Sequence, residues 1–148
     1  NNNIEMNNTP PIEIQEVSIK DDENNIISKI SHSNKIIVET KIRLLENNNN
    51  YNIGFTISDL YNNHLLGDGT TNMDGFSRLV KGDYIIKFII PGKIFNGGIF
   101  SVNFFIMDNE IVISRNVSVL NFEVTEAITN KYGYVPMKIE VEKEMIKY

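Results

Sequence analysis

The chain contains no cysteine and no tryptophan, and it has two histidines among 148 residues. Without cysteine it has neither a disulfide nor a thiolate ligand, and such a composition is typical of a reducing compartment. His32 and His64 have no partner at the spacing of a metal site, so we expect no metal. No apolar run reaches the roughly 20 residues of a membrane-spanning helix.

Positive charge is also scarce. Lys and Arg number 14 against 19 Asp and Glu, which gives a formal net charge of -5. Nucleic-acid binding needs a Lys/Arg surface facing the phosphates, so we expect no nucleic-acid partner. A polybasic membrane contact is disfavoured for the same reason. The hydrophobic content of 41% and the charged content of 22% are ordinary for one globular domain.

The motifs of common catalytic sites are missing as well. The sequence has no G-x-x-x-x-G-K-[ST] loop to hold nucleotide phosphates and no G-x-S-x-G elbow to present a nucleophilic serine. Paired carboxylates for glycoside hydrolysis stay open, because two strands can bring distant acids together. Most aspartates, however, fall in predicted turns, where the side chain binds the backbone. We therefore expect a binding protein that is not an enzyme and uses no cofactor.

What the sequence does have is alternation. Over residues 35–45, apolar side chains alternate with charged ones at the period of a half-buried strand. The pattern recurs over 12–19, 52–58, 84–90, 100–106, 111–115 and 120–124. A slip at 15–16 predicts a β-bulge, and the polar stretch 68–83 predicts a long connection across the fold. Many short strands with turns between them predict an all-β fold, an immunoglobulin-like or jelly-roll antiparallel β-sandwich.

We divide the chain into three parts. Residues 1–11, rich in asparagine and proline, are interpreted as the remnant of a linker. Residues 12–125 form the predicted sandwich. Residues 126–148 are a connector and a C-terminal strand, which alternation places at 135–141 and which could be exchanged between subunits. The asparagine run at 47–50 is interpreted as a solvated loop tip.

Three stretches within Ile12–Val124 resemble one known domain family. The first, NIGFTISD followed by YNN and LGDGTTN, lies in 52–72 and is similar to a "vGi.i.D..G..i.g.nT" pattern. Residues 88–106 and 120–124 resemble the "f.i.l.pG.Y.v.v.l" and closing "a..F.V" segments of the same family. This family is the C-terminal, polysaccharide-binding domain of the ATP-binding subunit of O-antigen and other polysaccharide ABC exporters. The chain departs from it at Asn62 and Asn63, where glycine is usual, but asparagine also tolerates positive φ.

The resemblance implies a function as well as a fold. Domains of this family recognise a finished, lipid-linked polysaccharide on the cytoplasmic side and couple it to the exporter. They tend to dimerise and to exchange a C-terminal strand between subunits. For this chain the resemblance implies a polysaccharide glycan as ligand, a homodimer, and contact with the membrane subunit of the transporter through a preceding ATP-binding domain. It also implies a cytoplasmic protein, peripheral at the inner face of the cytoplasmic membrane.

Sugar recognition needs amides, hydroxyls and charges for the sugar hydroxyls, and an aromatic face for its C–H side. The strands at 52–59 and 99–107 are expected to be neighbours. On their faces away from the core we predict the glycan-binding residues, which are Thr56, Ser58, Ser101, Asn103 and Phe105. The same residues can form an ordinary solvated sheet face or a face covered by the dimer partner. The turn Tyr61–His64 is a rival site.

Two other classes of function stay open. One is an extracellular lectin-like or adhesin-like module of the immunoglobulin type, and the other is a structural domain that serves only assembly. A signal peptide upstream of this segment would favour the extracellular module, whereas an upstream phosphate loop would favour the exporter. Detectable glycan binding by the isolated domain would count against the assembly domain.

Overall fold

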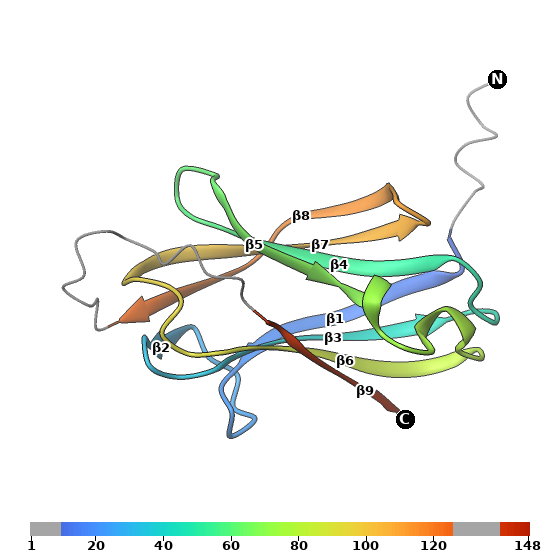
Figure 1. The fold of residues 1–148 in the computed structure, drawn as a ribbon, viewed down its shortest axis with the longest axis horizontal. Coiled ribbons are helices and arrows are strands. Elements are labelled where there is room, and N and C mark those ends of the chain that lie inside the picture. Colours follow the sequence, from blue (N-terminus) through green and yellow to red (C-terminus); the bar gives the residue numbers. More distant parts are fainter. Residues whose placement is uncertain (1–9, 126–139) are drawn as a thin grey trace.

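The strands form where the sequence alternates, and a computed structural model describes them for residues 10–125 and 140–148 (Figure 1). The elements in chain order are β1 (Ile12–Lys20), β2 (Lys29–Ser31), β3 (Ile36–Leu44), β4 (Tyr51–Ser58), β5 (His64–Gly69), the 3-10 helices η1 (Thr70–Asn72) and η2 (Phe76–Arg78), β6 (Gly82–Ile90), β7 (Gly98–Asp108), β8 (Ile111–Thr125) and β9 (Glu142–Lys147). The two strands predicted over 111–124 are one continuous strand, β8. No helix in the described ranges is long and apolar enough to cross a membrane.

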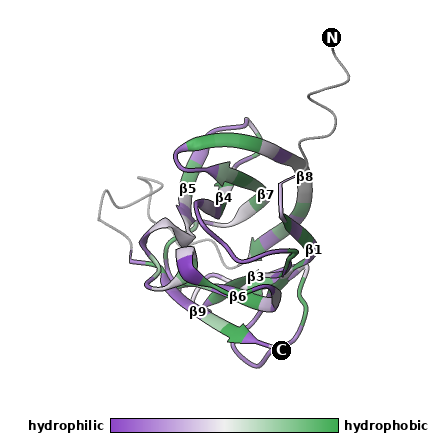
Figure 2. Ribbon diagram, turned by 90° about the vertical axis from the view of Figure 1, so that its right-hand side faces the viewer, coloured by the Kyte–Doolittle hydropathy of each residue, from purple (hydrophilic) through white to green (hydrophobic). Residues whose placement is uncertain are grey.

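The strands lie in two sheets that pack face to face (Figures 1 and 2). One sheet has four strands in the order β1, β3, β6, β9, and the other has five in the order β2, β8, β7, β4, β5. Among the described strands every pairing is antiparallel except that of the short β2 with the end of β8. The predicted all-β sandwich is therefore confirmed, with one parallel pair added to it.

The core is filled by the inward-facing half of each alternation. In β3 every even-numbered side chain is buried, as predicted, and β6 and β7 show the same period of two. The rings of Phe55 in β4 and Phe88 in β6 meet across the two sheets, with their centroids 4.7 Å apart. Burial of one large apolar side chain contributes about 1.5–3 kcal/mol, so this layer holds the sheets together.

Two irregularities predicted from the sequence are confirmed. The pairing of β1 with β3 shifts register between Ile14 and Glu16, where the alternation slips. The polar connection predicted over 68–83 is observed over residues 70–81, where it leads from β5 in the five-stranded sheet, through η1 and η2, to β6 in the four-stranded sheet. Each 3-10 helix buries one side chain, Thr70 in η1 and Phe76 in η2, so the connection is packed against the core.

The asparagine run at 47–50 is not uniformly solvated. Asn48 is buried, and its side-chain amide donates to the carbonyl oxygens of Tyr51 (3.0 Å) and Phe76 (2.8 Å). Its side-chain oxygen accepts from the backbone N–H groups of Asn49 (2.8 Å) and Tyr51 (3.1 Å). The interpretation as a solvated loop tip is therefore wrong for Asn48. The loop needs one side chain to satisfy backbone groups that no strand pairs.

Two turns with the pattern Asp-x-x-Asn-Asn, Asp21–Asn25 and Asp59–Asn63, fold alike. In each, one aspartate oxygen accepts from the backbone N–H groups two and four residues on, and the other accepts from the side-chain amide of the last asparagine. The fourth residue has positive φ, 67° at Asn24 and 65° at Asn62. Asn62 thus adopts the conformation that glycine would take in the family pattern.

β9 begins later than predicted. The strand predicted at 135–141 falls mainly on residues outside the described ranges, and the described residues 140–141 precede β9. The apolar alternation ends at the buried Val141, because residues 142–144 are all charged, so hydropathy alone does not mark where the pairing of β9 starts. Within the chain, β9 pairs antiparallel with β6, from Ile89 opposite Glu142 to Tyr84 opposite Lys147.

β9 also links the edges of the two sheets by an ion pair. The Nζ atom of Lys143 lies 3.0 Å from Oδ2 of Asp68 in β5, so an ion pair joins the outermost strands of the two sheets. Exchange of the C-terminal strand between subunits stays a prediction, as does the division of the chain into three parts. Residues 1–9 and 126–139, on which these predictions largely depend, lie outside the described residues.

Candidate functional site

The outer face of the five-stranded sheet arranges its side chains in rows, because directly paired residues point to the same face. Across β5, β4, β7 and β8, the first row consists of His64, Ser58, Ser101 and Asn121. The second row consists of Gly67, Thr56 and Asn103. The third row consists of Gly69, Gly54, Phe105 and Arg115. Small and polar residues dominate the first two rows.

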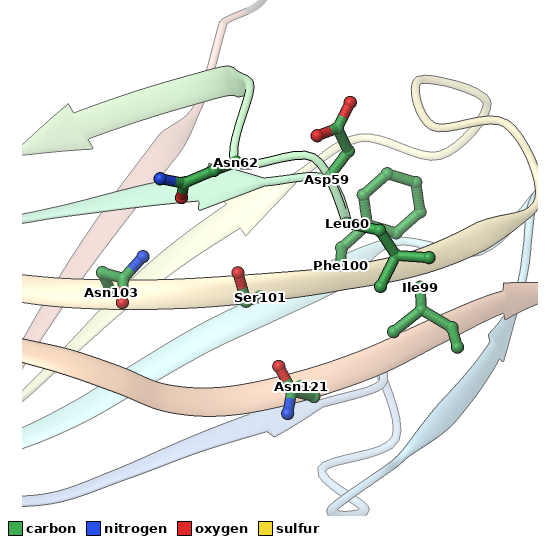
Figure 3. A pocket seen from close by; sticks show the side chains of 8 residues that line it. All are labelled: Asp59, Leu60, Asn62, Ile99, Phe100, Ser101, Asn103 and Asn121. Atoms are coloured by element: carbon green, nitrogen blue, oxygen red, sulfur yellow. The ribbon is translucent and has the colours of Figure 1, made fainter.

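A depression of about 370 Å³ lies on this face, where the turn between β4 and β5 approaches β7 (Figure 3). Its lining residues come from this turn, from β7 and from β8, and they are Asp59, Leu60, Asn62, Ile99, Phe100, Ser101, Asn103 and Asn121. In Figure 3 Leu60 and Ile99 lie at one end of the depression, and Asn62 and Asn103 lie toward the other. The depression therefore has an aliphatic end and an amide end.

The charge in the lining comes from Asp59. Its carboxylate accepts from the backbone N–H groups of Tyr61 and Asn63 (2.9 Å each) and from the side-chain amide of Asn63 (3.0 Å). The backbone N–H of Asn63, followed by its side-chain amide, holds the pKa of Asp59 below the ordinary 3.8, so the group is ionised at neutral pH. None of the described residues that line the depression is a lysine or an arginine.

The five predicted residues all lie on the outer face of β4 and β7, but they differ in what they contact. Ser101 and Asn103 line the depression, and Thr56 lies directly opposite Asn103 without lining it. Ser58 is fully buried, with its Oγ atom 3.3 Å from Nδ1 of His64. Its hydroxyl is therefore covered by the neighbouring strand instead of being presented at the surface.

Phe105 packs against a neighbouring strand of its own sheet. A Cβ atom placed on Gly54 would lie 2.5 Å from two ring atoms of Phe105, so the ring covers the bare backbone of Gly54. Phe105 is half-buried and does not line the depression. The structure gives its ring a packing contact within the sheet, at a distance of two residues from Asn103.

The rival prediction, the turn Tyr61–His64, belongs to the same surface. Asn62 lines the depression, Asn63 holds Asp59, and Tyr61 is 84% exposed at the tip of the turn. The two predicted sites are thus adjacent. The order of the strands along the sequence does not show this, because it depends on how the strands pair. The lining residues that the prediction missed are Asp59, Leu60, Ile99, Phe100 and Asn121. The sequence does contain a signal for Asn121. It alternates with two core residues of β8, which indicates that its side chain points to the outer face.

The lining offers side-chain amides, a hydroxyl and aliphatic carbon, which recognise a ligand by hydrogen bonds and apolar contact. In the part of the chain that the structure describes, no three histidine, aspartate or glutamate side chains are grouped as a metal ion would require. The fold and the depression together define an all-β sandwich domain with a small, largely polar depression on one sheet.

The comparison with known families identifies the domain type. Residues 7–137 match the model of the Wzt C-terminal domain. The chain therefore belongs to the Wzt C-terminal domain family, and the resemblance predicted from the sequence is confirmed. A solved structure described as the C-terminal domain of Wzt is similar to it in fold. The TM-score is 0.68 and the identity 15%, over 81% of this chain and 77% of that one.

Two further solved structures are similar at a lower level. The CARDB domain of the PF1109 protein from Pyrococcus furiosus has a TM-score of 0.42 and 12% identity, over 76% of this chain and 94% of that chain. A β-glucuronidase from Parabacteroides merdae has a TM-score of 0.41 and 9% identity, over 93% of this chain and 13% of that chain. No curated protein matches the chain by sequence.

Proposed function

We propose that this chain is the non-catalytic carbohydrate-recognition domain of a polysaccharide ABC exporter. In this function it binds a lipid-linked polysaccharide before export. Membership in the Wzt C-terminal domain family supports the link to the exporter. The observation that carries the binding function is the depression on the five-stranded sheet, where polar side chains from the turn, β7 and β8 converge beside exposed aliphatic ones.

The chemistry of the lining supports a sugar as ligand. The amides of Asn62 and Asn121 and the hydroxyl of Ser101 supply donors and acceptors for sugar hydroxyl groups. Leu60 and Ile99 supply an apolar surface for the C–H side of a ring. A volume of about 370 Å³ lies at the lower end of the roughly 300–1,000 Å³ of ligand pockets, which fits one or two sugar units.

The remaining parts of the proposal concern assembly. The domain acts as a homodimer in the cytoplasm, at the inner face of the cytoplasmic membrane. It contacts the membrane subunit of the transporter through an ATP-binding domain of the same subunit. In this arrangement β9, at the edge of the four-stranded sheet, is the strand that two subunits exchange, because its pairing with β6 can be made equally by a partner's copy.

Titration of the chain with the polysaccharide of its source strain, followed by NMR, tests the binding function. We expect saturable shifts at Ser101, Asn121 and the turn that begins at Asp59. Asn121→Ala should weaken binding roughly fivefold to tenfold by removing a hydrogen bond. The matched control is Asn49→Ala, an exposed asparagine outside the depression. Absence of shifts at millimolar sugar, with the chain folded, would overturn the proposal and favour a domain that serves only assembly.

A further inference from the structure

The charge of the side chains that line the depression determines which ligands it can accept. Among the described residues, Asp59 is the charged side chain that lines it, and the described cations of the same face lie outside the lining. Arg115 lies opposite Phe105, in the third row. Lys29 of β2 is paired with Glu123, with Nζ and Oε1 3.9 Å apart, and Glu123 itself lies opposite the lining residue Ile99. A bound anion would therefore lie near a fixed negative charge, and no lining cation from residues 10–125 or 140–148 would neutralise it.

We propose that the depression takes an electrically neutral sugar unit with an acetamido group, as in an N-acetylhexosamine, and disfavours uronate and phosphorylated units. This inference rests on the proposed function and names the class of sugar that the same site selects. Three features of the lining support it, namely its charge, its amides and its aliphatic end.

The charge argument concerns Asp59. Three hydrogen bonds from its own turn hold the carboxylate in place, so it cannot swing away from an approaching ligand without opening that turn. A second carboxylate or a phosphate in the depression would be repelled at close range and would also lose part of its hydration. A neutral sugar meets neither penalty. We expect the discrimination between a neutral unit and its uronate to be roughly tenfold.

The amide argument concerns the three asparagines of the lining. Of these, Asn62 and Asn121 supply the amides for a ligand, and each side-chain amide has one acceptor oxygen and one NH₂ donor. An acetamido group presents the complementary pair, a carbonyl oxygen and an N–H, on a fixed planar unit. Asn62 from the turn, Asn103 from β7 and Asn121 from β8 surround the depression from different elements. A planar amide can therefore be paired there in a way that a lone hydroxyl group cannot.

The aliphatic argument concerns Leu60 and Ile99. Both line the depression at the same end, and they are 70% and 46% exposed (Figure 3). Leu60 projects from the turn and Ile99 from β7, so a small apolar group between them would cover both side chains. The methyl group of an acetamido substituent has this size. A plain hexose can cover part of these side chains with the C–H side of its ring, but it has no methyl group to place between them.

A series of methyl glycosides tests the inference by NMR titration of the chain. The series comprises N-acetylglucosamine, N-acetylgalactosamine, glucose and glucuronate. We expect an N-acetylhexosamine to bind about fivefold or more tightly than glucose and to shift the methyl signals of Leu60 and Ile99. Glucuronate should bind roughly tenfold more weakly than glucose. Glucuronate binding as tightly as glucose, or the absence of an N-acetyl preference, would overturn the inference.

Variants separate the two selective features. Leu60→Ser should reduce the N-acetyl preference toward that of glucose, whereas Ile111→Ser, at an equally exposed position (70%) on β8, should leave it unchanged. Asp59→Asn keeps a side-chain oxygen for the turn and should bring glucuronate close to glucose. If the native polysaccharide binds but Leu60→Ser does not alter the preference, the inference fails and the proposed function stands. If neither polysaccharide nor glycosides bind, both fail.

Discussion

The ring of Phe105 lies over the backbone of Gly54, its direct partner across β4 and β7. The two residues are complementary, because the glycine leaves room for the ring and the ring shields a strand backbone that has no side chain of its own. From the sequence, an aromatic residue on the outer face of a sheet is interpreted as a surface on which a sugar can stack. In the structure the ring packs against Gly54 within the sheet, and its part in glycan binding stays a prediction.

The pair predicts an energetic coupling in a double-mutant cycle. Gly54→Ala in the native background should destabilise the chain by about 1–3 kcal/mol, because the new Cβ would lie 2.5 Å from the ring and must displace it. In the Phe105→Ala background the same change should cost less, because the ring is gone and the carbonyl oxygen of Asp68, 3.2 Å from the new Cβ, is the close contact that stays. Urea denaturation of the four proteins measures the cycle. Additive effects would contradict the contact.

Asn48 provides a second prediction within a run of identical residues. Asn48→Ala should destabilise the chain by about 2–3 kcal/mol, because it removes from a buried site the amide that donates to the carbonyl oxygens of Tyr51 and Phe76 and accepts from the backbone N–H of Tyr51. Asn49→Ala is the control, since the side chain of Asn49 is exposed and only its backbone N–H is used. Thermal unfolding of both variants is the measurement. Equal melting temperatures would show that Asn48 is not the residue that holds the loop.

The difference between these two asparagines shows what the sequence alone cannot predict. Alternation within one strand identified the buried faces of β3, β6 and β7, and a slip in it located the β1 bulge, because both are local properties of the chain. Four adjacent asparagines have no pattern that distinguishes them. The depression likewise depends on the pairing of β7 with β8, which places Asn121 opposite Ser101, and on the approach of a turn from β4. Such contacts between distant residues are absent from any one segment.

The two Asp-x-x-Asn-Asn turns predict a loss of stability in acid. The backbone N–H groups of Asn25 and Asn63 hold the pKa values of Asp21 and Asp59 below the 3.8 of an ordinary aspartate. Unfolded chains therefore take up these protons first as the pH falls. The stabilisation is complete above about pH 5 and is lost from near 3.8 downward, through the lower pKa values of the folded state.

The test is the urea midpoint of unfolding measured between about pH 6 and pH 2. The double variant Asp21→Asn, Asp59→Asn should be less stable than the native chain at neutral pH, because one acceptor oxygen in each turn becomes a donor. Its midpoint should also fall less steeply in acid. An acid slope identical to that of the native chain would show that these two carboxylates do not contribute to it.

At Thr40 we predict a substitution that makes the chain more stable. It is completely buried in β3, where it faces Val17 of β1 and Ile86 of β6 in the register of the sheet. Its hydroxyl oxygen has no hydrogen-bond partner among the described residues. Thr40→Val replaces this hydroxyl by a methyl group of similar size, so it should stabilise the chain by about 1 kcal/mol.

Thr40→Ser is the matched control, because it keeps the hydroxyl and removes the methyl group instead. It should destabilise the chain by roughly 1 kcal/mol through the lost apolar burial and the small cavity. Opposite shifts of the two variants in denaturant midpoint, with the slope of the transition unchanged, would locate the effect in the folded core. If Thr40→Val is destabilising instead, the hydroxyl has a partner in solution, and an ordered water between the sheets is the physical candidate.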